Sequence, residues 1–215
     1  MSLAHAAYDA TWGRMFAAMY DRGLKATEEG GLGEMRLQLL AGATGRVVEL
    51  GAGTGVNLDL YPDAITELVL VEPDPHMAKR LRERVAASPR PATIVEAPGE
   101  RLPLPDDSFD VAVATLVLCT VPDPAAALAE LRRVLVPGGR LLLIEHVRAE
   151  EAGLARWQDR LEKPWRFFGD GCHCNRDTAA TLAAAGFETG GLERGRLPKA
   201  PPLVRPLLRG SSALH

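Results

Sequence analysis

The feature that most constrains this chain is residues 47–55, Val-Val-Glu-Leu-Gly-Ala-Gly-Thr-Gly. An apolar run ends on a carboxylate and breaks into a loop with glycine at every second position, which predicts a buried strand followed by a tight turn. Glycine adopts positive φ and lets another molecule approach the backbone closely, and three in five residues cost folding entropy without such a reason. We therefore expect a ligand against Gly51, Gly53 and Gly55.

The charge beside this loop indicates the kind of ligand. A dinucleotide-binding loop has the spacing G-x-G-x-x-G, whereas position 56 here is Val56 and the third glycine comes one residue early. Glu49 stands directly before the loop, where it opposes a pyrophosphate and favours an ammonium or sulfonium. An NAD-dependent oxidoreductase is therefore a disfavoured alternative.

Composition disfavours nucleic-acid binding, membrane binding and a disulfide-stabilised fold. The 215 residues, 47% hydrophobic and 25% charged, suit a single α/β domain. A net charge of −3 gives no global field for nucleic acid or an anionic membrane. Three cysteines are too few for a disulfide framework, and we find no signal peptide and no apolar run of about 18 residues. We expect a cytoplasmic protein without an integral membrane segment, and the oligomeric state stays open.

Hydrophobic runs and helical spacing alternate along the chain. Strands are expected at residues 47–50, 68–72, 93–96, 109–118 and 140–146, and helices at 3–20, 32–40, 55–60, 75–86 and 124–135. This alternation predicts a parallel sheet covered on both faces, with ligands off the carboxyl ends of its strands. The helix at 55–60 would direct its N-terminus at a ligand carboxylate. Glu72, at the end of the second strand, is placed to accept from both hydroxyls of a ribose.

Two motifs carry a family resemblance. Residues 47–55 resemble motif I of the class I S-adenosylmethionine-dependent methyltransferases, and Leu-Arg-Arg-Val-Leu-Val-Pro-Gly-Gly-Arg-Leu at 131–141 resembles the post-motif signature of that superfamily. The resemblance, to the type 11 methyltransferase domain, implies a Rossmann-like fold: a seven-stranded, mostly parallel sheet with helices on both faces. Residues 1–215 would form one domain, with an N-terminal helical lid at 1–44, a cofactor-binding core at 45–146, and substrate-side helices and last strands at 147–215. The first helix is either a lid or plain structural packing.

The implied cofactor is S-adenosyl-L-methionine, with S-adenosyl-L-homocysteine as product and no metal. Many family members have an Asp where Pro98 stands, so adenine recognition would depend on backbone groups around Gly99. The residues assigned to the cofactor are Tyr20, Glu49, Gly51, Ala52, Gly53, Gly55, Asn57, Glu72, Pro73, Met77, Gly99, Glu100, Thr115 and Leu116.

Residues 145–187 resemble one subgroup, the membrane-associated alkyl-thiol S-methyltransferases of animals and related bacterial enzymes. The hydrophobic anchor of the animal proteins is missing, so membrane attachment is not carried over. The expected acceptor is a thiol of a small metabolite. The residues assigned to it are Tyr8, Trp12, Trp165, Phe168 and Cys172, and Trp157 and Phe167 would complete an apolar wall.

A thiol with a pKa near 8.5 is a few per cent ionised at neutral pH, so an elaborate base is not required. Asp170, His146 and His173 are the candidates to take or orient its proton, and a structural, hydrogen-bonded role is the alternative for each histidine. The adjacent run Cys172-His173-Cys174 lacks the spacing of a zinc site, and Cys119 is expected to be a buried apolar side chain. Two other functions stay open: methylation of an amine, hydroxyl or phospholipid headgroup, and a catalytically silent nucleoside-binding scaffold.

Overall fold

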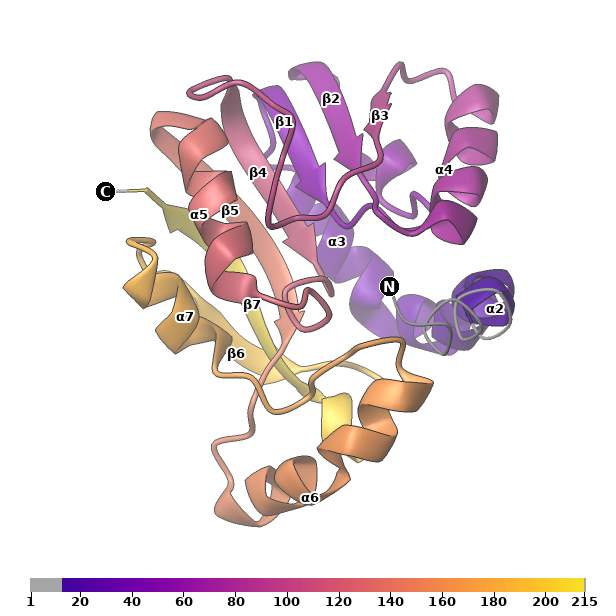
Figure 1. Ribbon diagram of the computed structural model, residues 1–215, viewed down its shortest axis with the longest axis vertical. Helices are drawn as coiled ribbons and strands as arrows, with labels where there is room; N and C mark the ends of the chain where they lie inside the picture. The colour runs from indigo at the N-terminus through magenta and orange to yellow at the C-terminus, as the bar shows by residue number, and fades with distance from the viewer. Residues whose placement is uncertain (1–12, 215) are drawn as a thin grey trace.

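The computed structural model describes residues 13–214, which build one seven-stranded sheet (Figure 1). The strand order is β3-β2-β1-β4-β5-β7-β6, in which β1 to β5 are parallel and β7 runs antiparallel to both of its neighbours. The strands are β1 (Gly45–Leu50), β2 (Ile65–Val71), β3 (Thr93–Val95), β4 (Phe109–Thr115), β5 (Leu135–His146), β6 (Glu193–Arg196) and β7 (Pro206–Ala213). The predicted fold class is therefore confirmed.

Alternate side chains of each strand enter two separate cores. Val48 of β1 packs in a cluster with α5 (Pro124–Val134) and α7 (Thr178–Ala184), while its neighbour Val47 packs in a cluster with α3 (Gly33–Leu40) and α4 (Pro75–Ala87). Because side chains in a strand point to opposite faces in turn, this pattern requires helices on both sides of the sheet. The sequence predicted α3, α4 and α5 to within one or two residues at each end.

Three of these helices begin at an aspartate. The side chains of Asp74, Asp123 and Asp177 accept hydrogen bonds from N–H groups in the first turns of α4, α5 and α7. In α4 and α5 a proline follows directly, where its missing N–H costs nothing and its fixed φ suits a helix. The aspartates therefore fix the residues at which these helices start. α4 starts in the segment that follows β2, and α5 starts in the segment that follows β4.

The helix predicted at 55–60 is wrong. Residues 51–57 form turns, and only a short 3-10 helix, Leu58–Leu60, follows them. Gly53 and Gly55 have φ of +57° and +81°, a left-handed backbone that an α-helix cannot contain, and the Gly55 N–H already donates to the Ala52 carbonyl at 2.8 Å. The predicted helix N-terminus for a ligand carboxylate therefore does not form at Gly55.

Two strand boundaries and one helix also differ from expectation. β4 ends at Thr115 instead of residue 118, because Leu116 adopts φ +59° and turns the chain. β5 begins at Leu135 instead of residue 140, since a slip in register lets the segment before the glycine turn pair with β4. The helix expected at 3–20 lies partly outside the described residues; α2 (Arg14–Thr27) covers its second half and continues to Thr27.

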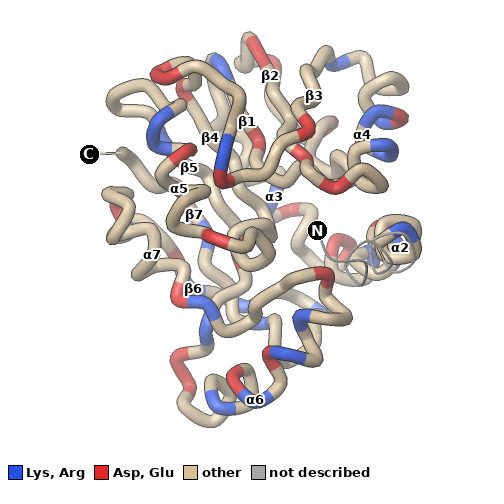
Figure 2. Tube along the Cα trace, viewed as in Figure 1, with Lys and Arg blue, Asp and Glu red and all other residues tan. Residues whose placement is uncertain are grey.

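Two helices lie beyond the carboxyl ends of the parallel strands (Figure 1). They are α2, which joins α3 through a π-helical turn at Glu28–Leu32, and α6 (Ala152–Phe168). A second 3-10 helix, Pro202–Val204, precedes β7. Lys and Arg are interspersed with Asp and Glu along the trace (Figure 2). Within residues 13–214, none of the helices has the length and apolar composition that a bilayer-crossing segment requires.

Candidate active site

The space around the Cα atom differs among the three loop glycines. A Cβ at Gly51 would overlap the Val117 side chain, and one at Gly55 would lie 2.7 Å from Leu81 Cδ1. A Cβ at Gly53 would meet no heavy atom within 4 Å. Close packing therefore explains Gly51 and Gly55, and Gly53 is the one that leaves room for a ligand.

Glu72 lies beside this space. One carboxylate oxygen accepts from the Gly53 N–H and the other from the Asp74 N–H, each at 2.8 Å. Burial raises the pKa of Glu72 to about 7, although these two hydrogen bonds favour the ionised form. A carboxylate with two oxygens has lone pairs left for further donors, so Glu72 retains the capacity for the predicted ribose contact.

Glu49 is turned into the protein. Its oxygens accept from Asn57 Nδ2 at 2.7 Å and from the Tyr61 hydroxyl at 2.8 Å, and its side chain is buried. Burial raises the pKa of Glu49, and these two hydrogen bonds act in the opposite direction. Direct contact of Glu49 with a cofactor stays a prediction, and its observed role is to fix Asn57.

Arg36 is a residue that the sequence did not identify. It is only 1% exposed, and its guanidinium donates to Glu28 at 3.1 Å, to Asn57 Oδ1 at 3.1 Å and to Thr115 Oγ1 at 2.8 Å. An arginine on an amphipathic helix is usually read as solvent-facing, so only the fold reveals it as a buried positive charge. Arg36 therefore connects α3 to the loop that follows β1, through Asn57, and to the end of β4, through Thr115.

α2 is attached to the glycine loop by a hydrogen bond and to α4 by an ion pair. Asp21 accepts from Thr54 Oγ1 at 2.6 Å and from Arg84 at 3.0 Å. One residue earlier, Tyr20 is half-buried, and burial raises the pKa of its phenol to about 12. The positive charge of Arg36 opposes this rise in the pKa of Tyr20.

The turn after β4 is held from two sides. The buried Glu145 carboxylate accepts from the backbone N–H groups of Val117 and Leu118 at 2.9 and 2.8 Å, and from that of Cys119 at 3.3 Å. Arg176 donates to the carbonyls on the other side of the same turn, at Leu118 and Val121. Burial raises the pKa of Glu145 to about 7. The turn is therefore a fixed platform at the carboxyl edge of the sheet.

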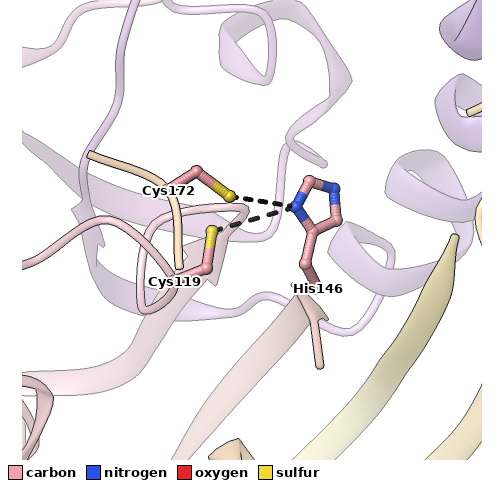
Figure 3. A group of neighbouring side chains, drawn as sticks. All are labelled: Cys119, His146 and Cys172. Atoms are coloured by element: carbon pink, nitrogen blue, oxygen red, sulfur yellow. Dashed lines mark hydrogen bonds between the residues drawn. The ribbon is translucent and has the colours of Figure 1, made fainter. Parts of the chain in front are cut away.

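Cys119 lies on this platform and faces two other side chains (Figure 3). The His146 Nδ1 is 4.0 Å from Cys119 Sγ and 3.6 Å from Cys172 Sγ. A hydrogen bond from the Cys119 thiol lowers the pKa of Cys172 to about 4, and His146 acts in the same direction, while burial opposes them. The pKa of Cys119 is raised correspondingly. The expected burial of Cys119 is confirmed, since it packs in an apolar cluster, and the fold also brings it close to His146 and Cys172.

The remaining residues that the sequence assigned to catalysis or to the acceptor do not form one group in the described residues. His173 Nδ1 pairs with Glu162 at 2.9 Å, and Cys174 Sγ contacts the Gln158 carbonyl at 4.0 Å. The side chains of residues 172–174 therefore contact different partners. Asp170 has φ +47°, a strained backbone for a residue other than glycine. Tyr8 and Trp12 lie outside the described residues.

The four aromatic residues of the predicted apolar wall differ in exposure. Trp165 is half-buried beside Cys172, whereas Trp157 is 54% exposed, Phe167 is 52% exposed and Phe168 is 62% exposed. Helical spacing alone could not show which side of α6 meets the domain. Trp165 is therefore the only one of these four that is not largely exposed, and contact of any of them with an acceptor stays a prediction.

The other cofactor candidates stand around the glycine loop. Ala52, Met77 and Gly99 are buried, and Pro73 is exposed. A Cβ at Gly99 would lie 2.9 Å from Leu50, so glycine allows the segment 97–110 to pack closely on β1. Glu100 accepts from the N–H of Asp123 at 3.0 Å. Their contacts with a cofactor stay predictions.

Comparison with known proteins places this site in a family. A family model described as a methyltransferase domain matches residues 48–143. The human thiol S-methyltransferase TMT1B is 41% identical over 170 residues, 76% of this chain and 68% of that protein. This chain is a class I S-adenosylmethionine-dependent methyltransferase. The human thiol S-methyltransferase TMT1A is 36% identical to this methyltransferase over 180 residues, 81% of this chain and 73% of that protein.

A solved structure gives the same family with a different named acceptor. A Thermotoga maritima methyltransferase, titled a possible histamine N-methyltransferase, superimposes with a TM-score of 0.68 at 25% identity, and covers 94% of this chain and 98% of that one. The family and fold imply S-adenosylmethionine as methyl donor. The open space over Gly53 and the adjacent Glu72 carboxylate fit such a ligand, because a nucleoside needs close approach to bare backbone and an acceptor for its ribose hydroxyls.

Proposed function

We propose that this methyltransferase methylates the sulfur of a small-molecule thiol. The observation that carries the proposal is the extent of the similarity to human thiol S-methyltransferase TMT1B. The family model covers only residues 48–143, so a match of 170 residues includes a large part of the chain outside the cofactor-binding core. The shared sequence thus extends beyond the cofactor-binding core.

The cofactor supplies a methyl group on a sulfonium, which is already activated for transfer. Glu72 and the backbone at Gly53 are the groups that would hold it. What the chain must add is orientation and exclusion of water, which together can contribute about 7–11 kcal/mol for well-placed reactants. α2, attached to the loop through Asp21, and the Glu145-held turn after β4 supply these two effects.

Proton removal from the thiol needs only a modest base, and His146 is the group that we assign to it. Its Nε2 is buried and has no hydrogen-bond partner among the described residues, while its Nδ1 faces the two cysteine sulfurs. A buried ring nitrogen without a partner is costly, which is expected where a substrate completes the hydrogen bond. Asp170, two residues before Cys172, stays the second candidate.

The experiment uses three acceptors that differ only in the reacting group: 2-mercaptoethanol, ethanolamine and ethylene glycol. Release of S-adenosylhomocysteine and the methylated product are measured for each. We expect turnover of the thiol well above that of the amine and the alcohol, and a loss of thiol turnover in His146→Gln. The amine is included because a structural relative is titled a possible histamine N-methyltransferase. Turnover of ethanolamine but not of the thiol would contradict the proposal, and no turnover with any acceptor would favour a binding scaffold.

A further inference from the structure

Three soft donor atoms from three separate elements meet at the acceptor side of the sheet (Figure 3). Cys119 follows β4, His146 ends β5, and Cys172 follows α6. The two sulfurs lie 4.0 and 3.6 Å from His146 Nδ1, and all three ligand atoms lie within 4.8 Å of one another. In a tetrahedral zinc site, with Zn–S of about 2.3 Å and Zn–N of about 2.0 Å, donor atoms are separated by about 3.5 to 3.8 Å. The observed spacings therefore exceed a zinc site's by at most about 1 Å.

The donors are held by the backbone. Glu145 fixes the turn that carries Cys119, and the Cys119 carbonyl accepts from the His173 N–H at 2.8 Å, which attaches the Cys172 loop to the same turn. Cys119 is 1% exposed and Cys172 is 5% exposed. A metal site needs donors fixed in advance by their surroundings, and these hydrogen bonds provide that.

We propose that Cys119, His146 and Cys172 bind one zinc ion, and that the acceptor thiol occupies its fourth coordination position as a thiolate. Three protein ligands with one open position are typical of catalytic zinc, and two cysteines with one histidine form such a set. Among residues 13–214, no fourth Cys, His, Asp or Glu joins the group. The identity of the fourth ligand rests on the proposed thiol methylation, whereas the metal site does not.

The chemistry balances without a further reactant. On coordination the acceptor S–H bond gives its proton to solvent, a Zn–S bond forms, and the water at the fourth position leaves. Zinc binds thiols in their deprotonated form, so the sulfur would be a nucleophile at neutral pH. With zinc bound at Nδ1, Nε2 of His146 carries the ring proton, so in the zinc-bound protein metal coordination replaces the role as base that the proposed function assigns to His146. The sequence expectation of no metal considered only the adjacent run 172–174, whereas this group forms from residues 119, 146 and 172.

The test begins with residues 1–215 after metal removal by a chelator under reducing conditions. Zinc is titrated back by equilibrium dialysis, and Co²⁺ is used as a spectroscopic substitute. We expect one zinc per chain and the intense sulfur-to-cobalt absorption of thiolate ligands. Cys172→Ser should weaken zinc binding by about 100-fold or more, because each ligand carries a share of the affinity. Cys174→Ser is the matched control, since this buried cysteine lies outside the group, and it should bind zinc as the parent does.

Two further measurements separate this inference from the proposed function. Adding 2-mercaptoethanol should change the visible spectrum of the Co²⁺ protein, whereas ethanolamine should not. The inference would be overturned if the wild-type protein bound no stoichiometric zinc, or if Cys172→Ser bound zinc equally well. Neither measurement depends on enzyme activity. Full thiol methylation by zinc-free protein would overturn it and leave the proposed function standing. A stable Cys119–Cys172 disulfide in place of zinc binding would also count against it.

Discussion

Replacing Gly53 with alanine tests whether the cofactor lies on this residue. The added methyl group would enter space where no heavy atom lies within 4 Å, so it displaces nothing in the free protein. The backbone φ of +57° is left-handed, which costs an L-residue about 1–2 kcal/mol. For a chain of this size we expect a fall in Tm of about 2–8 °C.

The effect on ligand binding should exceed this general cost. A methyl group placed where the cofactor contacts the backbone should produce an overpacking penalty of about 1–3 kcal/mol, which corresponds to a loss of affinity of about 5- to 160-fold. Gly138 provides the matched control. Its φ is +79°, a Cβ there would also meet nothing within 4 Å, and it lies at the opposite edge of the sheet. Gly138→Ala should therefore show the same small loss of stability and unchanged affinity.

Isothermal titration with S-adenosylhomocysteine, together with thermal unfolding of both variants and the parent, gives the two quantities. We expect similar Tm values for Gly53→Ala and Gly138→Ala, with weakened binding only in the first. Equal affinities in all three proteins would refute the assignment of the open space over Gly53 to the cofactor.

Three further predictions follow from the buried charges. The pKa of Glu72 is about 7 in the free protein, and the hydroxyl donors of a bound ribose would favour its ionised form. Affinity for S-adenosylhomocysteine should therefore rise about tenfold from pH 6 to pH 8. Calorimetric titration of Glu72→Gln should show little of this pH dependence. The fold raises the pKa of Glu145 from 4.5 to about 7, so between these pH values the folded protein binds more protons at Glu145 than the unfolded protein does. The contribution of Glu145 to stability is therefore greatest below about pH 4.5. It falls by about 3 kcal/mol as the pH rises to about 7. Urea unfolding should show about 2.4 kcal/mol of this fall between pH 5 and pH 7.5. A change of the same size in Glu145→Gln would argue against it. Arg36→Met leaves Glu28 unpaired and should cost about 3–5 kcal/mol in urea unfolding, whereas Arg22→Met on the exposed side of α2 should change stability by less than about 0.5 kcal/mol.

Local pattern was sufficient to predict the five parallel strands and α3, α4 and α5, whereas the seven-stranded sheet was expected only from the family resemblance. Apolar runs that end on Glu49 and Glu72 marked β1 and β2, and the aspartate-proline pairs before α4 and α5 marked where those helices start. Such signals act within a few residues, so they can be read without the fold. The helix predicted at 55–60 failed because the loop's left-handed glycines exclude it, although the same glycines were the strongest sign of a ligand.

The polar interior of the site could not be read in the same way. Arg36 contacts Thr115, 79 positions away, and Cys119 meets His146 and Cys172 only because three elements end at one edge of the sheet. Separations of this kind follow from topology and not from spacing. Exposure of Phe168 likewise depends on how α6 lies against the domain, which helical periodicity leaves undetermined.

The most direct test of the account is the position of the transferred methyl group. The protein is given donor carrying a deuterated methyl group and an acceptor that holds both a thiol and an amine, such as cysteamine, and the product is examined by mass spectrometry and NMR. Thiol methylation predicts the label on sulfur as a thioether, with the amine unmodified. Label on nitrogen, with the thiol intact, would contradict it.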